Sequence, residues 1–320
     1  MKIPLTRGWI PLLLAALLFP GAVARGASDP SDTDPTVFGD GIFNQFNNLD
    51  LGFAGRTHRW SIFTYGAGTS SSPFTALDVS GSKNNVSDVD DDVALAGSYS
   101  RLNVSNYGDV SGDRYEQTTS SETKSGNGFI GGSRISNAST NTLLNGGVTA
   151  LQTVSNNAFL LGVNLGSPTN INLSGSSMTF NNNPFGGKYV MKLTNFVLNN
   201  NSTLTLNGAA GSAFVINVSN NFSLANQSKI VLTGGLTPSD VLFNVRGSSG
   251  TFSIASGSLF QGTLLAYNST SSTQRTLTVS GANTLARGEL IANNVVVKNG
   301  ATVKKPKKKS RDDDDEGDHR

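Results

Sequence analysis

Short apolar runs bounded by Gly, Asn and Ser recur along this chain, and two of them are echoed near its C-terminal end. The run 214–218 (FVINV) returns at 241–245 (VLFNV), and 262–266 (GTLLA) returns at 288–292 (GELIA). The two echoes lie 27 and 26 positions apart. A near-constant period in this range is typical of a solenoid, in which each repeat adds one coil that cannot bury its apolar side alone.

In other segments apolar residues alternate with hydroxyl residues, as in 203–206 (TLTL) and 276–279 (TLTV). Alternation places aliphatic side chains on one side of a strand and hydroxyls on the other. A solenoid wall needs this pattern, because aliphatic residues stack inside while Thr and Ser face water. We therefore predict a mainly β solenoid. Four Asn residues in or just after the strand phrases predict amide ladders that link the coils: Asn217, Asn244, Asn268 and Asn294.

One stretch breaks the β pattern. Its apolar residues follow the spacing of one helical face: Leu144, Val148, Leu151 and Val154. We predict a single helix over Leu143–Asn157, capped by Thr140 or Asn141 and packed on the side of the solenoid. The stretch Tyr115–Asn127 is polar and aperiodic, and it predicts a long loop or an insertion.

Composition divides the chain into four parts. Residues 1–24 have the basic start, apolar core and small-residue ending of a secretory signal peptide, and the apolar run is too short for a membrane span. Residues 25–36, rich in Ser, Asp and Pro, predict a flexible leader. We assign 37–303 to one solenoid domain and 304–320, a basic block followed by an acidic one, to a disordered tail. We expect a secreted, extracellular or cell-surface protein that does not span a membrane.

Charge and cysteine usage exclude several classes of function. The chain has 24 basic and 22 acidic residues, and loss of the signal peptide removes the two extra basic ones. A near-neutral protein has no global field to attract nucleic acid. The absence of Cys excludes thiol nucleophiles and cysteine metal sites.

With these segments in view, the chain resembles the choice-of-anchor A domain, a family of secreted or surface bacterial proteins. The likeness covers 37–303 and rests on the segment 87–97 (SDVDDDVALAG), on the helix with Leu151 and Ser155, and on the echoed phrases. Asp91 departs from the family pattern, which commonly has Gly there. The resemblance implies a right-handed β-solenoid of roughly triangular section with one α-helix along its side, akin to ice-binding-protein-like domains. It brings no established activity.

Candidate chemistry is sparse. The two His residues, His58 and His319, have no nucleophile elbow or metal motif beside them, so we predict no catalytic residue and no cofactor. Asp88, Asp90 and Asp92 alternate as at the start of a calcium-binding loop, but the Gly and the closing Glu of such a loop are missing. These residues are weak calcium candidates, and a solvated strand face is the alternative.

Three functions follow from this pattern. The first is a structural or adhesive surface protein without catalytic activity, whose partners would be extracellular matrix, surface polysaccharide or other surface proteins. The second is an ice-binding protein, because a flat hydroxyl surface on a rigid solenoid can order water. Its ligand-face candidates are Thr203, Thr205, Thr276 and Thr278. The third is a polysaccharide-binding or polysaccharide-acting solenoid, which would need a cleft with clustered carboxylates.

Overall fold

The structure is a computed structural model that describes residues 60–164, 167–182, 187–247, 252–267 and 275–305. All of these belong to one compact unit, Pro35–Arg320. The predicted signal peptide and leader, both His residues, Asn268 and the tail beyond residue 305 lie outside the described residues. Within the described ranges, no helix is long and apolar enough to cross a membrane.

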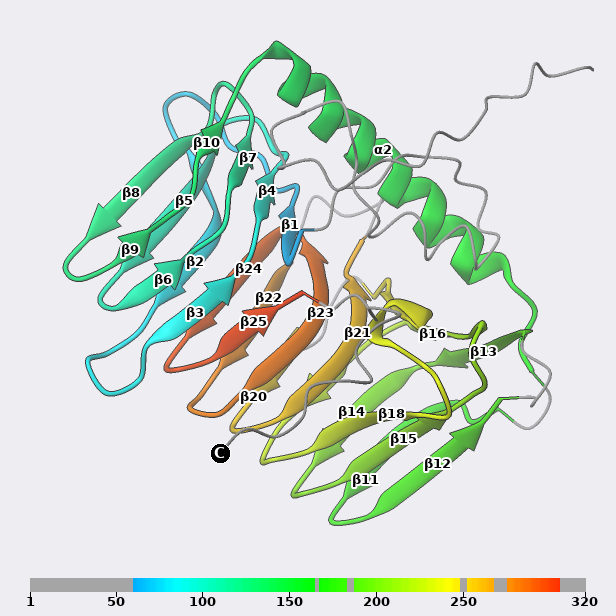
Figure 1. Ribbon diagram of the computed structural model, residues 1–320. Coiled ribbons are helices and arrows are strands. Elements are labelled where there is room, and N and C mark those ends of the chain that lie inside the picture. The colour runs from blue at the N-terminus through cyan, green and yellow to red at the C-terminus, as the bar shows by residue number, and fades with distance from the viewer. Residues whose placement is uncertain (1–59, 165–166, 183–186, 248–251, 268–274, 306–320) are drawn as a thin grey trace, which may run out of the picture. The chain divides into compact units, whose positions relative to one another are not determined.

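The described strands wind into a β-solenoid whose coils have three sides (Figure 1). The first side is a parallel nine-stranded sheet, and we call its outer surface the amide–hydroxyl face. In spatial order its strands are β11 (Asn170–Ser174), β14 (Asn195–Asn199), β17 (Phe222–Leu224), β20 (Phe252–Ala255), β22 (Thr276–Ser280), β24 (Asn294–Lys298), β2 (Phe74–Ser80), β5 (Ser100–Ser105) and β8 (Ser121–Ser125). The predicted mainly β solenoid is confirmed.

A second, 16-stranded parallel sheet forms the other two sides. The outer surface of its first side is the charged face, with strands β12 (Ser177–Asn181), β15 (Thr203–Asn207), β18 (Lys229–Thr233), the first halves of β21 (Leu259–Leu265) and β23 (Leu285–Ala292), β25 (Thr302–Lys304), β3 (Ser87–Asp90), β6 (Gly108–Val110) and β9 (Phe129–Ile130). The outer surface of its second side is the helix face, with strands β13 (Gly187–Leu193), β16 (Ser212–Val218), β19 (Val241–Val245), the second halves of β21 and β23, β1 (Ile62–Thr64), β4 (Val93–Leu95), β7 (Arg114–Glu116) and β10 (Arg134–Ile135). A 3-10 turn, η1 (Pro238–Asp240), precedes β19.

Two glycines carry β21 and β23 around the corner between these sides. Gly262 and Gly288 are register partners with φ of 143° and 144°, a region that side chains rarely adopt. A Cβ on Gly288 would lie 1.8 Å from the carbonyl oxygen of Gly262. The Gly that opens each of the two echoed phrases is therefore required by the corner.

The coils do not stack in sequence order. The first three coils end at β10, the chain returns to the far end of the stack, and the later coils then build back toward the start (Figure 1). As a result β24 pairs with β2, β25 pairs with β3, and β23 pairs with β1. The last described strands therefore pair with the first ones, and this pairing joins the two parts of the solenoid into one stack.

The helix α2 (Ala138–Leu160) makes the return journey along the helix face (Figure 1). Its 23 residues span about 35 Å, and nine strands at their usual spacing stack over about 38 Å. The predicted helix exists but is longer at both ends, and the predicted cap is wrong. Asn137 caps it by accepting a hydrogen bond from the Thr140 amide, because the apolar stripe begins only after the first turn.

The buried stripe of α2 runs through Gly147 rather than Val148. A Cβ at Gly147 would lie 3.2 Å from Cζ of Phe63 on β1, so the glycine admits a close approach of the helix to the sheet. Leu144, Leu151 and Val154 are fully buried on either side of it. These contacts outweigh the cost of glycine in the helix, about 1 kcal/mol relative to Ala.

Aliphatic and phenyl side chains fill the inside of the coils. Phe196, Phe222, Phe243 and Phe260 pack with ring centroids 5.1–6.0 Å apart. This is the interior that the alternating pattern predicts, since one residue in two on each strand points inward.

The coil of β7 and β8, at one end of the stack, departs from this pattern. The stretch Tyr115–Asn127, predicted as a loop, contains the end of β7 and the whole of β8. Glu122 is the register partner of the buried Leu102, so it occupies an inward position. Its carboxylate lies 2.7 Å from Nε of Arg114, another inward residue. The prediction was wrong because charged pairs replace apolar residues inside this coil.

Candidate functional site

The amide–hydroxyl face carries a continuous uncharged surface. On its first five strands, β11 to β22, every outward side chain is Asn, Ser, Thr, Ala or Val, and none of them is fully buried. These side chains are Asn170, Asn172, Ser174, Asn195, Val197, Asn199, Ser223, Ser253, Ala255, Thr276, Thr278 and Ser280. The inward partners on the same strands are all buried apolar residues, so the sheet beneath the surface is anchored.

Hydrogen bonds between neighbouring coils fix many of these side chains. Asn195 donates through Nδ2 to Oδ1 of Asn170 (3.1 Å) and accepts through Oδ1 from Nδ2 of Asn221 (3.0 Å). The hydroxyls of Ser223 and Ser253 lie 3.3 Å apart. Side chains that bond to the equivalent residue of the next coil keep the spacing of the strands, so the surface is regular and pre-ordered.

Register defines a central column of outward residues across this face. In spatial order it is Asn172, Val197, Ser223, Ser253, Thr278, Val296, Asp78, Asn103 and Thr123. Charge enters the face beyond β22, with Lys298 on β24, Asp78 on β2 and Arg101 on β5. The uncharged area is therefore confined to the part of the solenoid that follows α2 in the sequence.

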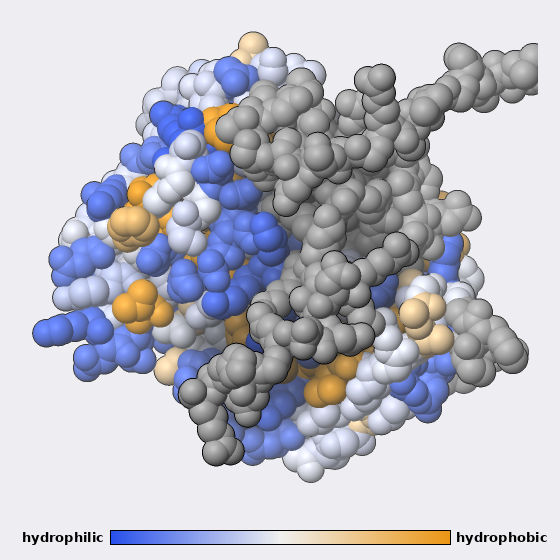
Figure 2. All heavy atoms as spheres, viewed as in Figure 1, coloured by the Kyte–Doolittle hydropathy of each residue, from blue (hydrophilic) through white to orange (hydrophobic). Residues whose placement is uncertain are grey.

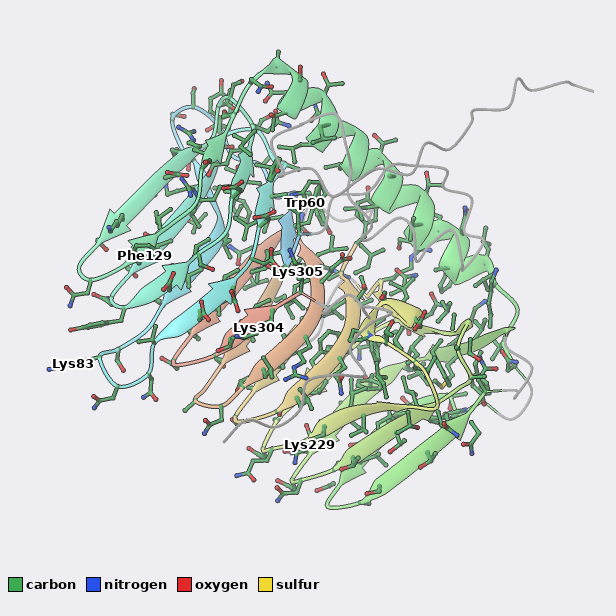
Figure 3. All side chains as sticks on the ribbon, in the orientation of Figure 1. Trp60, Lys83, Phe129, Lys229, Lys304 and Lys305 are labelled. Atoms are coloured by element: carbon green, nitrogen blue, oxygen red, sulfur yellow. The ribbon has the colours of Figure 1, made fainter. Side chains whose placement is uncertain are left out.

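Unlike the amide–hydroxyl face, the charged face has charged outward side chains on the strands in its middle. It carries the outward cations Lys229 and Lys304 (Figure 3) and Arg287. Asp88 and Asp90 lie on the neighbouring strand β3. Lys304 forms an ion pair with Asp90 (Nζ–Oδ2 2.9 Å). In Figure 2 hydrophilic residues cover most of this face around β3 and β6. Strand β25 runs to Lys304, one residue beyond the predicted end of the domain.

The four predicted ligand-face threonines lie on two different sides of the solenoid. Thr203 and Thr205 are on β15 of the charged face, whereas Thr276 and Thr278 are on β22 of the amide–hydroxyl face. They cannot act as one surface. The alternating pattern identifies outward positions on a strand, but it does not say which of the three sides that strand occupies.

The sequence matches the profile of a known protein family. The profile of the ice-binding-like family matches residues 94–303, about two thirds of the chain. The chain belongs to the ice-binding-like family. A search of curated proteins gave no match, and the finer assignment to the choice-of-anchor A domain stays a prediction.

Solved structures similar to this ice-binding-like chain include three structures of ice-binding proteins. One is from an Antarctic biological consortium, with 19% identity, a TM-score of 0.45, and coverage of 76% of this chain and 96% of that one. One is the glycosylated ice-binding protein LeIBP of an Arctic yeast, with 16% identity and a TM-score of 0.46. The match covers 79% of this chain and 93% of that one. The third is a domain of ice-binding protein 1 from Shewanella frigidimarina, with 16% identity and a TM-score of 0.46. The match covers 78% of this chain and 95% of that one.

The calcium candidates of this ice-binding-like protein do not converge. Asp88 and Asp90 share the outer side of β3, while Asp92 lies past the end of that strand. Asp92 accepts the backbone N–H of Asp113 (2.7 Å), and Asp113 accepts that of Ser133 (2.5 Å), so these two carboxylates stack as a corner ladder. No group of three or more His, Asp or Glu side chains among the described residues could hold a metal ion.

Burial and the neighbouring carboxylates of Asp109 and Asp90 raise the pKa of Asp88. Burial is the larger cause, and the two carboxylates add the repulsion expected between like charges on the same and neighbouring strands. The nearby Lys304 lowers the pKa of Asp88 in part, while Lys305 pairs with Asp91 (2.7 Å). The acidic residues thus behave as parts of a mixed-charge surface.

One pair of carboxylates does come together, but inside the fold. Burial, followed by the adjacent Glu122, raises the pKa of Glu116 from 4.5 to about 7. Glu116 is fully buried and pairs with Arg134 (Nε–Oε2 2.9 Å), while Glu122 pairs with Arg114. Glu116 is enclosed in the coil at the β8 end of the stack, and both carboxylates are held in ion pairs with arginines. A carboxylate pair that a glycosidase could use would have to flank an accessible bond.

Sequence reasoning missed most of the uncharged surface. Asn170, Asn172 and Asn195 have no β-branch, and Asn is depleted in strands, so their segments carry a weaker strand signal than Thr-x-Thr segments. The usable signal was the absence of Lys, Arg, Asp and Glu from every outward position of five successive strands. That signal needs the register between coils, which sequence periodicity did not supply.

Proposed function

We propose that this protein binds ice through the amide–hydroxyl face, on strands β11 to β22. One observation carries the proposal: on five adjacent strands every outward side chain is uncharged and of modest size. Membership of the ice-binding-like family supports the same function. The other two sides are less suited, because α2 covers one and charged residues occupy the other.

The spacing of this surface fits an ordered water layer. Parallel strands repeat about every 4.8 Å, and outward residues on one strand repeat about every 6.6 Å. Hydroxyls, amides and methyl groups on such a grid can hold water molecules at regular positions, with distances close to the repeats of oxygen atoms in ice. An ammonium group binds its own hydration shell strongly, and that shell competes with the ice lattice.

The test is a charge placed in the central column of the face, at Thr278 on β22. Thr278→Lys should remove most thermal hysteresis and most inhibition of ice recrystallisation. Thr205→Lys is the matched control, because Thr205 is equally half-exposed on the charged face, and it should leave both activities near the wild-type level. Absence of activity in the unsubstituted protein, or equal losses in the two variants, would contradict the proposal.

We further propose that the protein is exported, on the evidence of the signal-peptide pattern in residues 1–24. Fractionation of cells into cytoplasm, surface and medium tests this. The structural or adhesive role and the choice-of-anchor A assignment have no observation of their own in the described residues, and they remain predictions. The absence of enzymatic activity is likewise a prediction, supported by the burial of Glu116 and by the arginine ion pairs that engage both Glu116 and Glu122.

A further inference from the structure

The C-terminal end of α2 leaves an apolar segment in water. Residues 159–163 read FLLGV, and the side chains of Phe159, Leu160 and Val163 are 40%, 77% and 45% exposed. Among the described residues only two other large apolar side chains are exposed, Val86 and Phe129, and each lies apart from this segment. Single exposed apolar residues are common on soluble proteins, but a contiguous group marks an interaction site.

Two cations lie beside this segment. Nζ of Lys192 is 5.0 Å from the centroid of the Phe159 ring, and Cζ of Arg246 is 4.6 Å from it. Arg246 also donates from Nη2 to Oδ1 of Asn156 (3.0 Å), which fixes the guanidinium next to the helix. Lys192 stands on β13 and Arg246 follows β19, near the end of α2 that Figure 1 shows beside β13. We call Phe159, Leu160, Val163, Lys192 and Arg246 the helix-tip patch.

A purely structural account explains only part of this patch. Cations near the C-terminus of a helix are favourable, and a cation over an aromatic ring is attracted to it. These effects account for Lys192, Arg246 and one face of Phe159. They do not account for Leu160, the most exposed large apolar side chain in the described structure, or for Val163.

We propose that the helix-tip patch docks the protein onto a membrane surface that carries anionic phospholipids. Leu160, Val163 and Phe159 can enter the boundary between headgroups and acyl chains, while Lys192 and Arg246 meet lipid phosphates. No charged residue lies in α2 to oppose this approach. A second copy docked through the same patch would bring the cations of both molecules together, which disfavours a symmetric dimer.

Sedimentation with lipid vesicles tests this proposal on the full chain. Vesicles of phosphatidylcholine containing phosphatidylglycerol should bind the protein, and vesicles of phosphatidylcholine alone should bind it about tenfold less. Added salt should weaken the binding, because it screens the charges. Leu160→Ser with Val163→Ser should abolish it, and Lys192→Gln with Arg246→Gln should reduce it about tenfold.

Val86→Ser is the matched control, since Val86 is 48% exposed but lies outside the helix-tip patch, and it should bind like the wild type. Melting temperatures of all variants establish that each is folded. The Leu160→Ser, Val163→Ser variant should keep full thermal hysteresis, which separates this site from the amide–hydroxyl face. The proposal is overturned by equal binding to neutral vesicles, by no binding to either kind, or by a concentration-dependent dimer that the Leu160→Ser, Val163→Ser change dissolves.

Discussion

The helix face and the amide–hydroxyl face are built by the same coils and have opposite outer surfaces. On the helix face the outward residues Val215, Leu242, Leu265 and Ile291 are fully buried, and they pack with the apolar stripe of α2. On strands β11 to β22 of the amide–hydroxyl face the outward positions hold Asn, Ser, Thr and a few small apolar residues. Both surfaces are uncharged over much of their area, but one is dry and the other meets water.

This difference is written in the local sequence. Strands β16 and β19 are buried at every position and are apolar except for Ser212, Asn217 and Asn244, whereas β14 and β22 alternate between buried and more exposed residues. A strand covered on both sides gives an unbroken run, and a strand covered on one side gives alternation. The echoed phrases therefore belong to the side that the helix covers, and they serve stability rather than ligand binding.

The largest contrast is expected for aliphatic truncations on the two faces. Leu242→Ala should lower the free energy of unfolding by about 2–5 kcal/mol, because it leaves a cavity between α2 and the sheet. Val197→Ala removes an outward aliphatic side chain from the amide–hydroxyl face, which water already reaches, and should cost less than about 1 kcal/mol. Denaturant unfolding curves measure both. Similar losses in the two variants would show that α2 does not seal the helix face.

Much of the fold could be predicted from the sequence because its periodicities are local. The period of the echoed phrases, the Thr–Leu alternation and the helical spacing around Leu151 each depend on a few neighbouring residues. The cap at Asn137 and the strand β8 were not predicted, because neither shows such a local pattern. The first lies more than a turn before Leu143, the first large apolar residue of the helix, and the second has Glu122 where the neighbouring coil has Leu102.

The candidate site was less predictable than the fold. Thr276 and Thr278 were identified from alternation, but the same rule selected Thr203 and Thr205, which lie on another side. The side that a strand occupies depends on where the corners fall, and corners are set by residues such as Gly262 whose role shows only when coils are stacked. The order of the coils was also hidden, because α2 carries the chain back to the far end of the stack and the last coils then come to lie beside the first.

An intermediate contrast is expected for the amide ladders. Asn244 donates through Nδ2 to Oδ1 of Asn217 (2.7 Å) and to the carbonyl oxygen of Ser155 (2.9 Å), and it accepts from Oγ of Ser155 (2.8 Å). The predicted ladder between Asn217 and Asn244 is thus confirmed, and α2 covers it. Asn244→Ala should cost about 1–3 kcal/mol, because it leaves the buried Asn217 Oδ1 and Ser155 Oγ without this partner.

The half-exposed Asn207 supplies the comparison for that variant. It donates to Oδ1 of Asn181 on the charged face (2.9 Å), where water can replace the lost hydrogen bond. Asn207→Ala should therefore change the free energy of unfolding by less than about 0.5 kcal/mol. If Asn244→Ala were no more destabilising than Asn207→Ala in the same unfolding assay, the ladder beneath α2 would not link helix and sheet.

The smallest effect is expected where a hydroxyl is exchanged for a methyl group within the central column. Thr278→Val keeps the shape of the side chain. The central column already contains valines, with Val296 next to Thr278 on one side and Val197 three strands away on the other. The stability should change by less than about 0.5 kcal/mol, as for most exposed substitutions. Thermal hysteresis should stay close to the wild-type level, in contrast to the loss expected for Thr278→Lys. If Thr278→Val lost as much activity as Thr278→Lys, one hydroxyl would carry ice binding, rather than the regular and uncharged character that distinguishes this face from its charged neighbour.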